Sequence, residues 1–223
     1  MYIIPFKKVL RFNSDVEFII GDCRVGKSNY ACAQAQKFIK KGYRVYCNFH
    51  MLGTYRFDIN DLMVYDFEEG AVMVFDEIAS CGLASRGDSY KNSNTPNVIE
   101  FFTTYGHYKF EKIIIISPSF QDCIPVVRSR VTGVTVCKKP IITTLLLKPL
   151  NFILKLFKKN PIKFTLQKYI SKHIDIVNKD GGAPEEVYKW IFLKRTYTFQ
   201  NKWFKYFDSF TQKNLFKKDW IMW

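Results

Sequence analysis

Residues 21–28 read Gly-Asp-Cys-Arg-Val-Gly-Lys-Ser and match the phosphate-binding loop pattern G-x-x-x-x-G-K-[ST] at every required position. Glycine at 21 and 26 lets the backbone turn where a Cβ would clash, so that successive N–H groups can converge on phosphate oxygens. The flanking residues agree, because 16–20 is a short apolar run suited to a buried strand and 26–41 can form a helix. The sequence therefore predicts a strand, a phosphate-binding loop and a helix in that order.

Two side chains of this loop carry specific chemistry. Lys27 reaches the outer phosphates of a bound nucleotide, and the Ser28 hydroxyl can ligate Mg²⁺. The sequence therefore predicts ATP and Mg²⁺ as ligands, with the nucleotide bound by Gly21, Asp22, Cys23, Arg24, Val25, Gly26, Lys27, Ser28 and Asn29.

A second motif lies at residues 72–77, which read Val-Met-Val-Phe-Asp-Glu. Four apolar residues followed by Asp-Glu are typical of a Walker B motif. A buried strand carries Asp76 to the carboxyl edge of the sheet beside the loop, where it can hold Mg²⁺ together with Ser28. Glu77 can orient and polarise an attacking water, and the Asp-Glu pair favours hydrolysis over phosphoryl transfer to a small acceptor.

Further catalytic residues are expected around the γ-phosphate. Ser117 ends the apolar run KIIIIS and suits a polar sensor of that phosphate. An arginine from a neighbouring subunit commonly completes such sites, because it stabilises charge in the transition state. Arg128 and Arg130, at the end of a short helix, are candidates for this role, and Arg86 is a further candidate. The predicted catalytic residues are Lys27, Glu77, Ser117, Arg128 and Arg130.

Apolar runs alternate with helical segments along the first part of the chain. This alternation predicts an α/β fold with a mostly parallel central sheet flanked by helices. Together with the two motifs it predicts a P-loop NTPase of the ASCE (RecA-like) class, in which an extra strand lies between the two motif strands. We expect strands at 16–20, 44–48, 71–75, 112–117 and 131–136, helices at 26–41, 96–107 and 122–130, a short helical turn at 58–63 and a loop at 79–96.

The charge of the chain indicates a polyanionic partner. The formal net charge is +14, with 34 Lys and Arg against 20 Asp and Glu, and most of the excess lies after residue 138. Nucleic acid and an anionic membrane face are both compatible with this charge, and so is general solubility of a Lys-rich protein. Six cysteines are scattered without a C-x-x-C pair, which favours a reducing cytoplasm over a zinc site or a disulfide framework.

Beyond residue 138 the composition changes. Residues 140–157 are apolar but interrupted by Lys148, Pro149 and Lys155, whereas a membrane-spanning helix needs about 20 predominantly apolar residues. A basic surface helix in the membrane interface and a helix packed on the protein or on a neighbouring subunit both remain open. The last forty residues interleave aromatic and basic side chains, which suits single-stranded nucleic acid or a docked hydrophobic module.

These changes of composition predict three parts. They are a P-loop ATPase domain at 1–138, a basic apolar helical segment at 139–177 and a C-terminal aromatic and basic module at 178–223.

Several downstream strings are more specific than the two motifs. They are RVYCNF at 44–49, VMVFDE at 72–77, Ser85-Arg86, VIEFF at 98–102, Gly106-His107-Tyr108, IIIISPSFQD at 113–122, Val127-Arg128 and WFKYFDSF at 203–210. With the loop at 21–28, these strings resemble the zonular occludens toxin (Zot) family, the assembly ATPases of filamentous phages and their prophage relatives. The resemblance covers about 16–137 and the patch at 203–210.

The resemblance implies an inner-membrane-associated ATPase that drives virion assembly and extrusion and handles single-stranded DNA and coat protein. Two positions depart from the pattern of that family. Gly106 stands where relatives typically have Arg, and Ser117-Pro118 stands where they often have Ser-Gln or Thr-Gln. Ser117 or Gln121 would then have to sense the γ-phosphate, and turnover would be slow or depend on a partner.

The sequence as a whole predicts an ATPase that is a motor of phage virion morphogenesis. Its expected partners are copies of itself in a ring, single-stranded phage DNA and coat or other assembly proteins, in the host cytoplasm or peripherally at the cytoplasmic face of the inner membrane. A viral DNA-packaging translocase is the nearest alternative. A nucleotide-binding structural or DNA-binding subunit with little turnover is another, and a nucleoside kinase would need a substrate lid that is not evident after residue 77.

Overall fold

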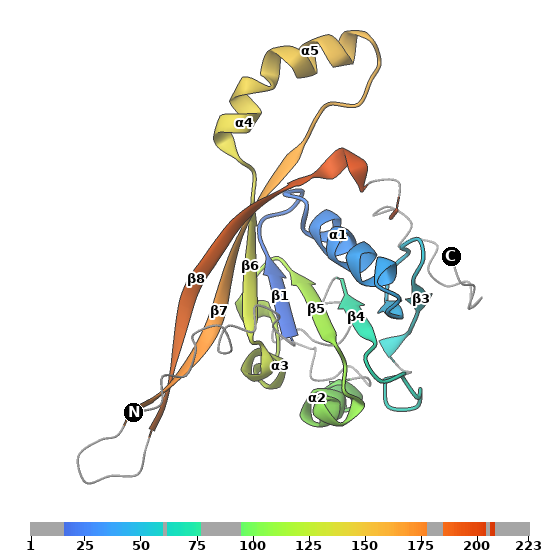
Figure 1. Ribbon diagram of the computed structural model, residues 1–223, viewed down its shortest axis with the longest axis vertical. Helices are drawn as coiled ribbons and strands as arrows, with labels where there is room; N and C mark the ends of the chain where they lie inside the picture. The colour runs from blue at the N-terminus through green and yellow to red at the C-terminus, as the bar shows by residue number, and fades with distance from the viewer. Residues whose placement is uncertain (1–15, 60–61, 77–94, 178–184, 204–205, 208–223) are drawn as a thin grey trace.

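In the computed structural model, residues 16–59, 62–76, 95–177, 185–203 and 206–207 are described. Their strands form one sheet in the order β3-β2-β4-β5-β1-β6-β7-β8 (Figure 1). The strands are β1 (Val16–Ile20), β2 (Val45–Cys47), β3 (Tyr55–Arg56), β4 (Val72–Phe75), β5 (Lys112–Ser117), β6 (Gly133–Lys138), β7 (Phe164–Val177) and β8 (Glu185–Phe199). The α-helices are α1 (Lys27–Lys40), α2 (Thr95–Thr104), α3 (Pro125–Arg130), α4 (Ile141–Leu146) and α5 (Lys148–Leu156), and the 3₁₀ helices are η5 (Tyr105–Tyr108), η6 (Phe120–Asp122) and η7 (Gln200–Lys202).

The order of the strands confirms the predicted fold class. Every neighbouring pair from β3 to β6 is parallel. At one side of the sheet, the pairs β6–β7 and β7–β8 are antiparallel. Strand β5 lies between β1, which leads into the phosphate-binding loop, and β4, which leads to Asp76. One strand therefore separates the two motif strands, which is the ASCE arrangement of a P-loop NTPase.

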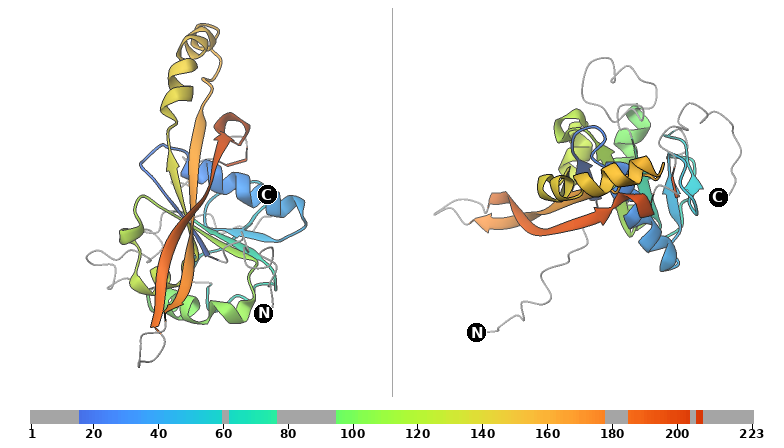
Figure 2. Two further views of the ribbon diagram at one scale, coloured as in Figure 1. Left: turned by 60° about the vertical axis from the view of Figure 1, so that its left-hand side comes forward. Right: turned by 90° about the horizontal axis from the view of Figure 1, so that it is seen from above.

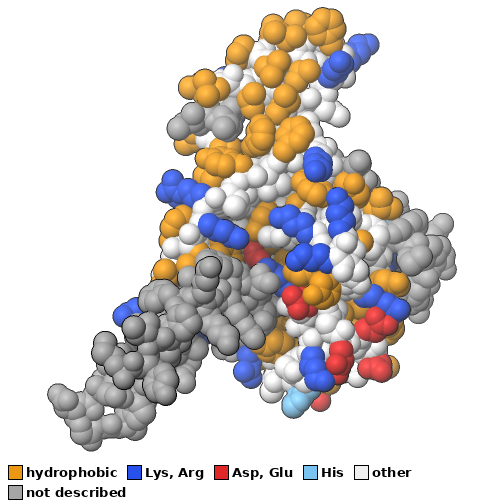
Figure 3. Space-filling model, in the orientation of Figure 1, with side chains coloured by type: hydrophobic (Ala, Val, Ile, Leu, Met, Phe, Trp, Pro, Cys, Tyr) orange, Lys and Arg blue, Asp and Glu red, His pale blue; other side chains and the backbone are white. Residues whose placement is uncertain are grey.

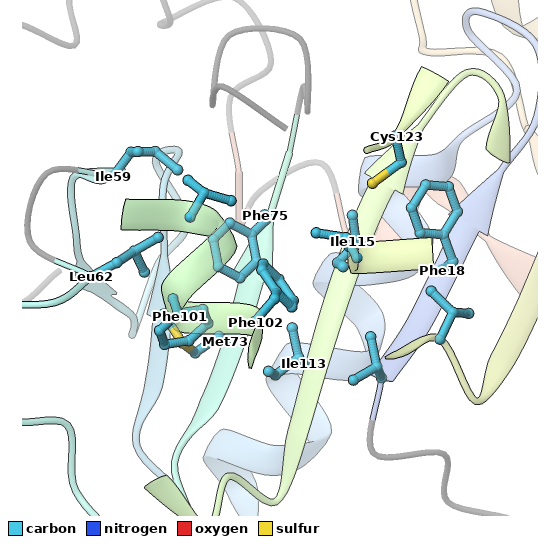
Figure 4. Close-up of a cluster of buried hydrophobic side chains, with 14 of the residues drawn as sticks. Phe18, Ile59, Leu62, Met73, Phe75, Phe101, Phe102, Ile113, Ile115 and Cys123 are labelled. Carbon is cyan, nitrogen blue, oxygen red and sulfur yellow. The ribbon is translucent and has the colours of Figure 1, made fainter. Parts of the chain in front are cut away.

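Successive residues of a strand point to opposite faces of the sheet, and in the parallel strands the side chains on both faces are buried. On one face, Phe75 and Ile115 pack with Phe101 and Phe102 of α2, as Figure 4 shows. On the other face, Val74 and the residues of these strands that point to the same side pack under α1. This arrangement explains why the strands read as continuous apolar runs, since neither face meets water.

Two helices differ from the predicted bounds. Residue 122 does not begin a helix, because the Ser119 hydroxyl accepts a hydrogen bond from the Gln121 N–H and caps the short helix η6 instead. Helix α3 begins at Pro125, whose missing N–H suits the first turn of a helix. Helix α2 ends at Thr104 and continues as η5. The predicted loop at 79–96 lies almost entirely outside the described residues.

The helical prediction for residues 139–177 was wrong in its second half. Helices α4 and α5 occupy the first half, but residues 164–177 form strand β7, which pairs with β6 and β8 in the same sheet. The inward positions of β7 include Thr165 and Gln167, which are buried although they are polar. Because these positions are not apolar, the alternation typical of a strand was hidden in the sequence.

Helices α4 and α5 form an arm that projects from the sheet between β6 and β7 (Figures 1 and 2). Its return to the sheet is fixed by Asn151, whose side chain accepts a hydrogen bond from the Ile162 N–H at 2.7 Å and donates to the Ile162 carbonyl at 3.0 Å. Among the described residues, no helix has the length and apolar character that crossing a membrane requires.

Candidate nucleotide-binding site

The loop at 21–26 turns tightly between β1 and α1. Gly21 and Gly26 have φ angles of 150° and 95°, which other residues rarely adopt, and Arg24 is also left-handed with φ 59°. A Cβ on Gly21 would lie 2.4 Å from the carbonyl oxygen of Cys137 on the neighbouring strand β6. The first glycine is therefore required by the close approach of another strand as well as by its φ angle.

The Lys27 ammonium lies across the loop. Its Nζ donates to the carbonyl oxygens of Gly21 at 2.7 Å and Asp22 at 2.9 Å. These bonds hold a positive charge within the curve of the loop, and the side chains of residues 22–24 are exposed around it. The charge and the converging loop backbone together form a cradle for an anion.

The two motifs meet at the first turn of α1. The Ser28 hydroxyl donates to Oδ2 of Asp76 at 2.7 Å, which joins residues that are 48 positions apart in the sequence. A hydroxyl and a carboxylate are the oxygen ligands that Mg²⁺ prefers. The predicted metal ligands therefore lie together, and their chemistry fits the ion. No cluster of three or more His, Cys, Asp or Glu that could hold a metal occurs elsewhere in the described part of the chain.

Asn48, which was not among the predicted site residues, fixes the position of Asp76. Its Nδ2 donates to the Asp76 carbonyl at 2.8 Å, and its Oδ1 accepts from the Asp76 N–H at 2.8 Å. The two bonds hold the backbone that carries the Asp76 carboxylate at the end of β4. The signal in the sequence was an Asn directly after a buried strand, at the same sheet edge as Asp76.

Ser117 ends β5 opposite Ile20 of β1, so it lies beside the start of the phosphate-binding loop. Its hydroxyl is buried and donates to the Ser119 carbonyl at 3.0 Å. The next carbonyl, that of Pro118, accepts a hydrogen bond from the Gly21 N–H at 3.4 Å. The position fits the predicted sensor, and the sensing role stays a prediction.

Arg128 and Arg130 lie away from the loop. Thr132, two residues after Arg130, pairs with Val16 at the amino end of β1, whereas the loop follows the carboxyl end of that strand. Helix α3 is accordingly found at the opposite edge of the sheet (Figure 1). These arginines cannot reach the loop of their own chain, so the predicted role in a neighbouring subunit is the one that the geometry leaves open.

The other predicted positions divide in two. Asn29 is buried, and its Nδ2 donates to the Gln200 carbonyl at 2.9 Å, so its side chain supports the structure behind the loop. Glu77 and Arg86 lie outside the described residues, and their roles stay predictions.

A buried charged group lies under the site. Glu17 of β1 forms an ion pair with Lys112 of β5 at 2.5 Å, and the Thr135 hydroxyl donates to its other oxygen. Burial raises the pKa of the nearby Tyr30 phenol, and the charge of Glu17 raises it further. Burial likewise raises the pKa of the Cys137 thiol to about 12. Both groups are therefore neutral at physiological pH.

No protein-family model matches the sequence, and no curated protein matches it. Among solved structures, the N-terminal domain of zonular occludens toxin from Neisseria meningitidis is similar, with a TM-score of 0.46, 11% identity, and coverage of 87% of this chain and 99% of that domain.

Two solved structures of genome-packaging NTPases are also similar. The NTPase B204 from Sulfolobus turreted icosahedral virus 2, bound to AMPPCP, has a TM-score of 0.44 and 12% identity over 71% of this chain and 93% of that one. The DNA-packaging ATPase B204 from Sulfolobus turreted icosahedral virus has a TM-score of 0.43 and 14% identity over 71% of this chain and 92% of that one.

Proposed function

We propose that this chain is an ATP-hydrolysing motor of phage virion morphogenesis. The observation that carries the proposal is the bond between the Ser28 hydroxyl and the Asp76 carboxylate at 2.7 Å, beside a loop that already holds the Lys27 ammonium. A metal ligand pair next to a phosphate cradle is the arrangement needed to bind the triphosphate of ATP.

Each residue has a role that follows from its chemistry. The loop N–H groups and Lys27 hold the phosphates, and Ser28 and Asp76 would hold Mg²⁺. The bound ion neutralises negative charge on the phosphate oxygens. Glu77, directly after Asp76, orients the attacking water, and Asn48 keeps Asp76 in place. An arginine of a neighbouring subunit, Arg128 or Arg130, completes the site in a ring of copies.

Single-stranded DNA is the proposed polymer on which the motor acts, with coat or other assembly proteins as further partners. The support is strand β8, where exposed rings and cations lie close together in the sequence. Trp190, Phe192 and Tyr197 are 45%, 51% and 60% exposed, and Lys194 and Arg195 lie among them. Bases can stack on such rings while the cations neutralise phosphates.

The test is product analysis with purified protein, ATP and Mg²⁺. We expect ADP and inorganic phosphate in equal amounts, and faster turnover when single-stranded DNA is added. Stimulation by duplex DNA alone would favour the packaging translocase. Tight ATP binding without phosphate release, even with DNA and assembly partners, would favour a structural subunit and contradict the proposal. A phosphorylated acceptor would indicate a kinase.

The arm formed by α4 and α5 supports a location at the membrane. Lys148, Asn151 and Lys155 follow each other at helical spacing on one side of α5, while apolar residues cover the rest of the helix. Phe152, Leu156 and the neighbouring apolar side chains are exposed. Figure 3 shows hydrophobic side chains gathered over the arm. No Asp or Glu occurs from residue 123 to 174.

We infer that the arm lies on an anionic lipid surface, at the cytoplasmic face of the inner membrane. Lipid fits better than an acidic protein surface, because α5 carries large apolar side chains beside Lys148 and Lys155, which together need both a hydrocarbon and an anionic layer. The exposed fractions are large, with 65% for Phe152 and 67% for Leu156.

Co-sedimentation with vesicles checks this location. We expect the protein to bind vesicles rich in phosphatidylglycerol, to bind phosphatidylcholine vesicles weakly, and to lose binding when Phe152 and Leu156 are both replaced by Ser. Val64→Ser is the matched control, because Val64 is 86% exposed and lies away from the arm. Unchanged binding of the double variant would contradict the location. Loss of oligomer with no effect on vesicles would assign the arm to a subunit contact instead.

A further inference from the structure

Behind the phosphate-binding loop, the antiparallel strand pair places buried polar side chains against the loop backbone. Thr165 near the start of β7 is fully buried, and Gln200 directly after β8 is 6% exposed. Thr165 Oγ1 donates to the carbonyl oxygen of Val25 at 2.8 Å, and Gln200 Nε2 donates to the same oxygen at 3.3 Å. Gln200 Nε2 also donates to Thr165 Oγ1 at 2.6 Å. One loop carbonyl is therefore held by two side chains from the far end of the chain.

This contact fixes the direction of a phosphate-binding donor. The Val25 carbonyl and the Gly26 N–H belong to the same planar peptide group, and in a trans peptide the two bonds point in opposite directions. Holding the oxygen toward Thr165 and Gln200 therefore turns the Gly26 N–H away from them. In loops of this kind, the N–H groups on that inner side bind the phosphate oxygens.

The second glycine of the loop leaves room for this contact. A Cβ on Gly26 would lie 2.3 Å from Thr165 Oγ1 and 2.7 Å from Gln200 Nε2. The φ angle of 95° alone favours glycine at this position. The close approach of the two polar side chains excludes a larger residue for a second and independent reason.

Gln200 is itself held on both sides. Its backbone N–H donates to the Lys163 carbonyl at 2.9 Å, where the chain enters β7. Its carbonyl accepts from Asn29 Nδ2 at 2.9 Å, in the first turn of α1. These two bonds fix the backbone of Gln200, from which its side chain reaches the Val25 carbonyl.

The geometry points to Thr165 and Gln200 as positioning residues of the nucleotide site, which hold the Val25 carbonyl so that the Gly26 N–H faces the bound phosphate. This inference rests on the proposed function and deepens it. It makes the antiparallel strand pair a working part of the ATP site, although β7 and β8 lie outside the parallel core that carries both motifs.

The experiment compares nucleotide affinity with stability in matched variants. Thr165→Val removes the hydroxyl at nearly constant size, and Thr165→Ser keeps it. Thr54→Val is the control, because the Thr54 hydroxyl is also buried and donates to a backbone carbonyl, that of Met51, at 2.8 Å, but between β2 and β3. Binding of a non-hydrolysable ATP analogue and the urea unfolding midpoint are measured for each, together with the amide resonance of Gly26 without nucleotide.

We expect Thr165→Val to bind the analogue about 10-fold more weakly and to shift the Gly26 resonance, since the Val25 carbonyl loses the shorter of its two hydrogen bonds and keeps only the 3.3 Å bond from Gln200. Thr165→Ser should restore both readings, and Thr54→Val should lose a similar amount of stability with unchanged affinity. Unchanged affinity in Thr165→Val, or an equal loss in Thr54→Val, would overturn the inference. Because binding is measured without turnover, a wild-type protein that binds ATP but does not hydrolyse it contradicts the proposed function and leaves this comparison intact.

Discussion

Replacing Lys27 by Met is expected to lower ATP turnover by at least about 100-fold, the usual cost of removing a positioned donor from a phosphoryl-transfer site. Methionine keeps an unbranched side chain but has no ammonium to stabilise charge on the outer phosphates. The structural cost should be small, because the bonds that Lys27 makes within the described part of the chain are to two loop carbonyls, those of Gly21 and Asp22. Phosphate release and the urea unfolding midpoint measure the two effects separately.

Two further variants make this result specific. Lys40 is exposed in the last turn of the same helix, so Lys40→Met should leave turnover unchanged. Glu77→Gln should also lose turnover while it keeps ATP affinity, because the residue is proposed to act on water and not on the phosphates. Wild-type rates in both Lys27→Met and Glu77→Gln would contradict the proposed function.

Replacing Lys112 by Met is expected to destabilise the fold by about 3–5 kcal/mol, because it leaves the Glu17 carboxylate buried without its partner. The two side chains are 8% and 1% exposed, and Nζ and Oε2 are 2.5 Å apart. For a domain of this size such a loss lowers the melting temperature by about 6–20 °C. Urea unfolding at constant pH measures it.

The chain provides its own control for this ion pair. Lys109 and Glu69 are also 2.5 Å apart, but their side chains are 66% and 73% exposed. Lys109→Met should therefore cost less than about 1 kcal/mol, because water screens the pair. The double variant Glu17→Leu with Lys112→Met should recover much of the stability lost in the single variant. Equal losses for Lys112→Met and Lys109→Met would show that burial does not set the strength of the pair.

The parallel core could be predicted because its strands are buried on both faces. Runs such as KIIIIS have no polar alternation. The strand predicted at 112–117 has the same first and last residue as β5. The same reasoning failed for β7, where polar residues occupy inward positions. The burial of the Thr165 hydroxyl is compensated by a hydrogen bond to the carbonyl of Val25, 140 positions away in the sequence, and hydrophobic periodicity cannot detect such a bond.

By itself, the sequence determined the phosphate-binding loop, the Asp that follows a buried strand and the α/β class, because spacing along the chain is enough to specify them. The tertiary structure alone decided which distant groups act on that loop. Asn48 hydrogen-bonds the backbone of Asp76, and Thr165 and Gln200 hydrogen-bond the carbonyl of Val25. Arg128 and Arg130 lie at the opposite edge of the sheet from the loop. The physical reason is that these contacts depend on strand order and on the direction of single peptide groups, neither of which has a local signature in the sequence.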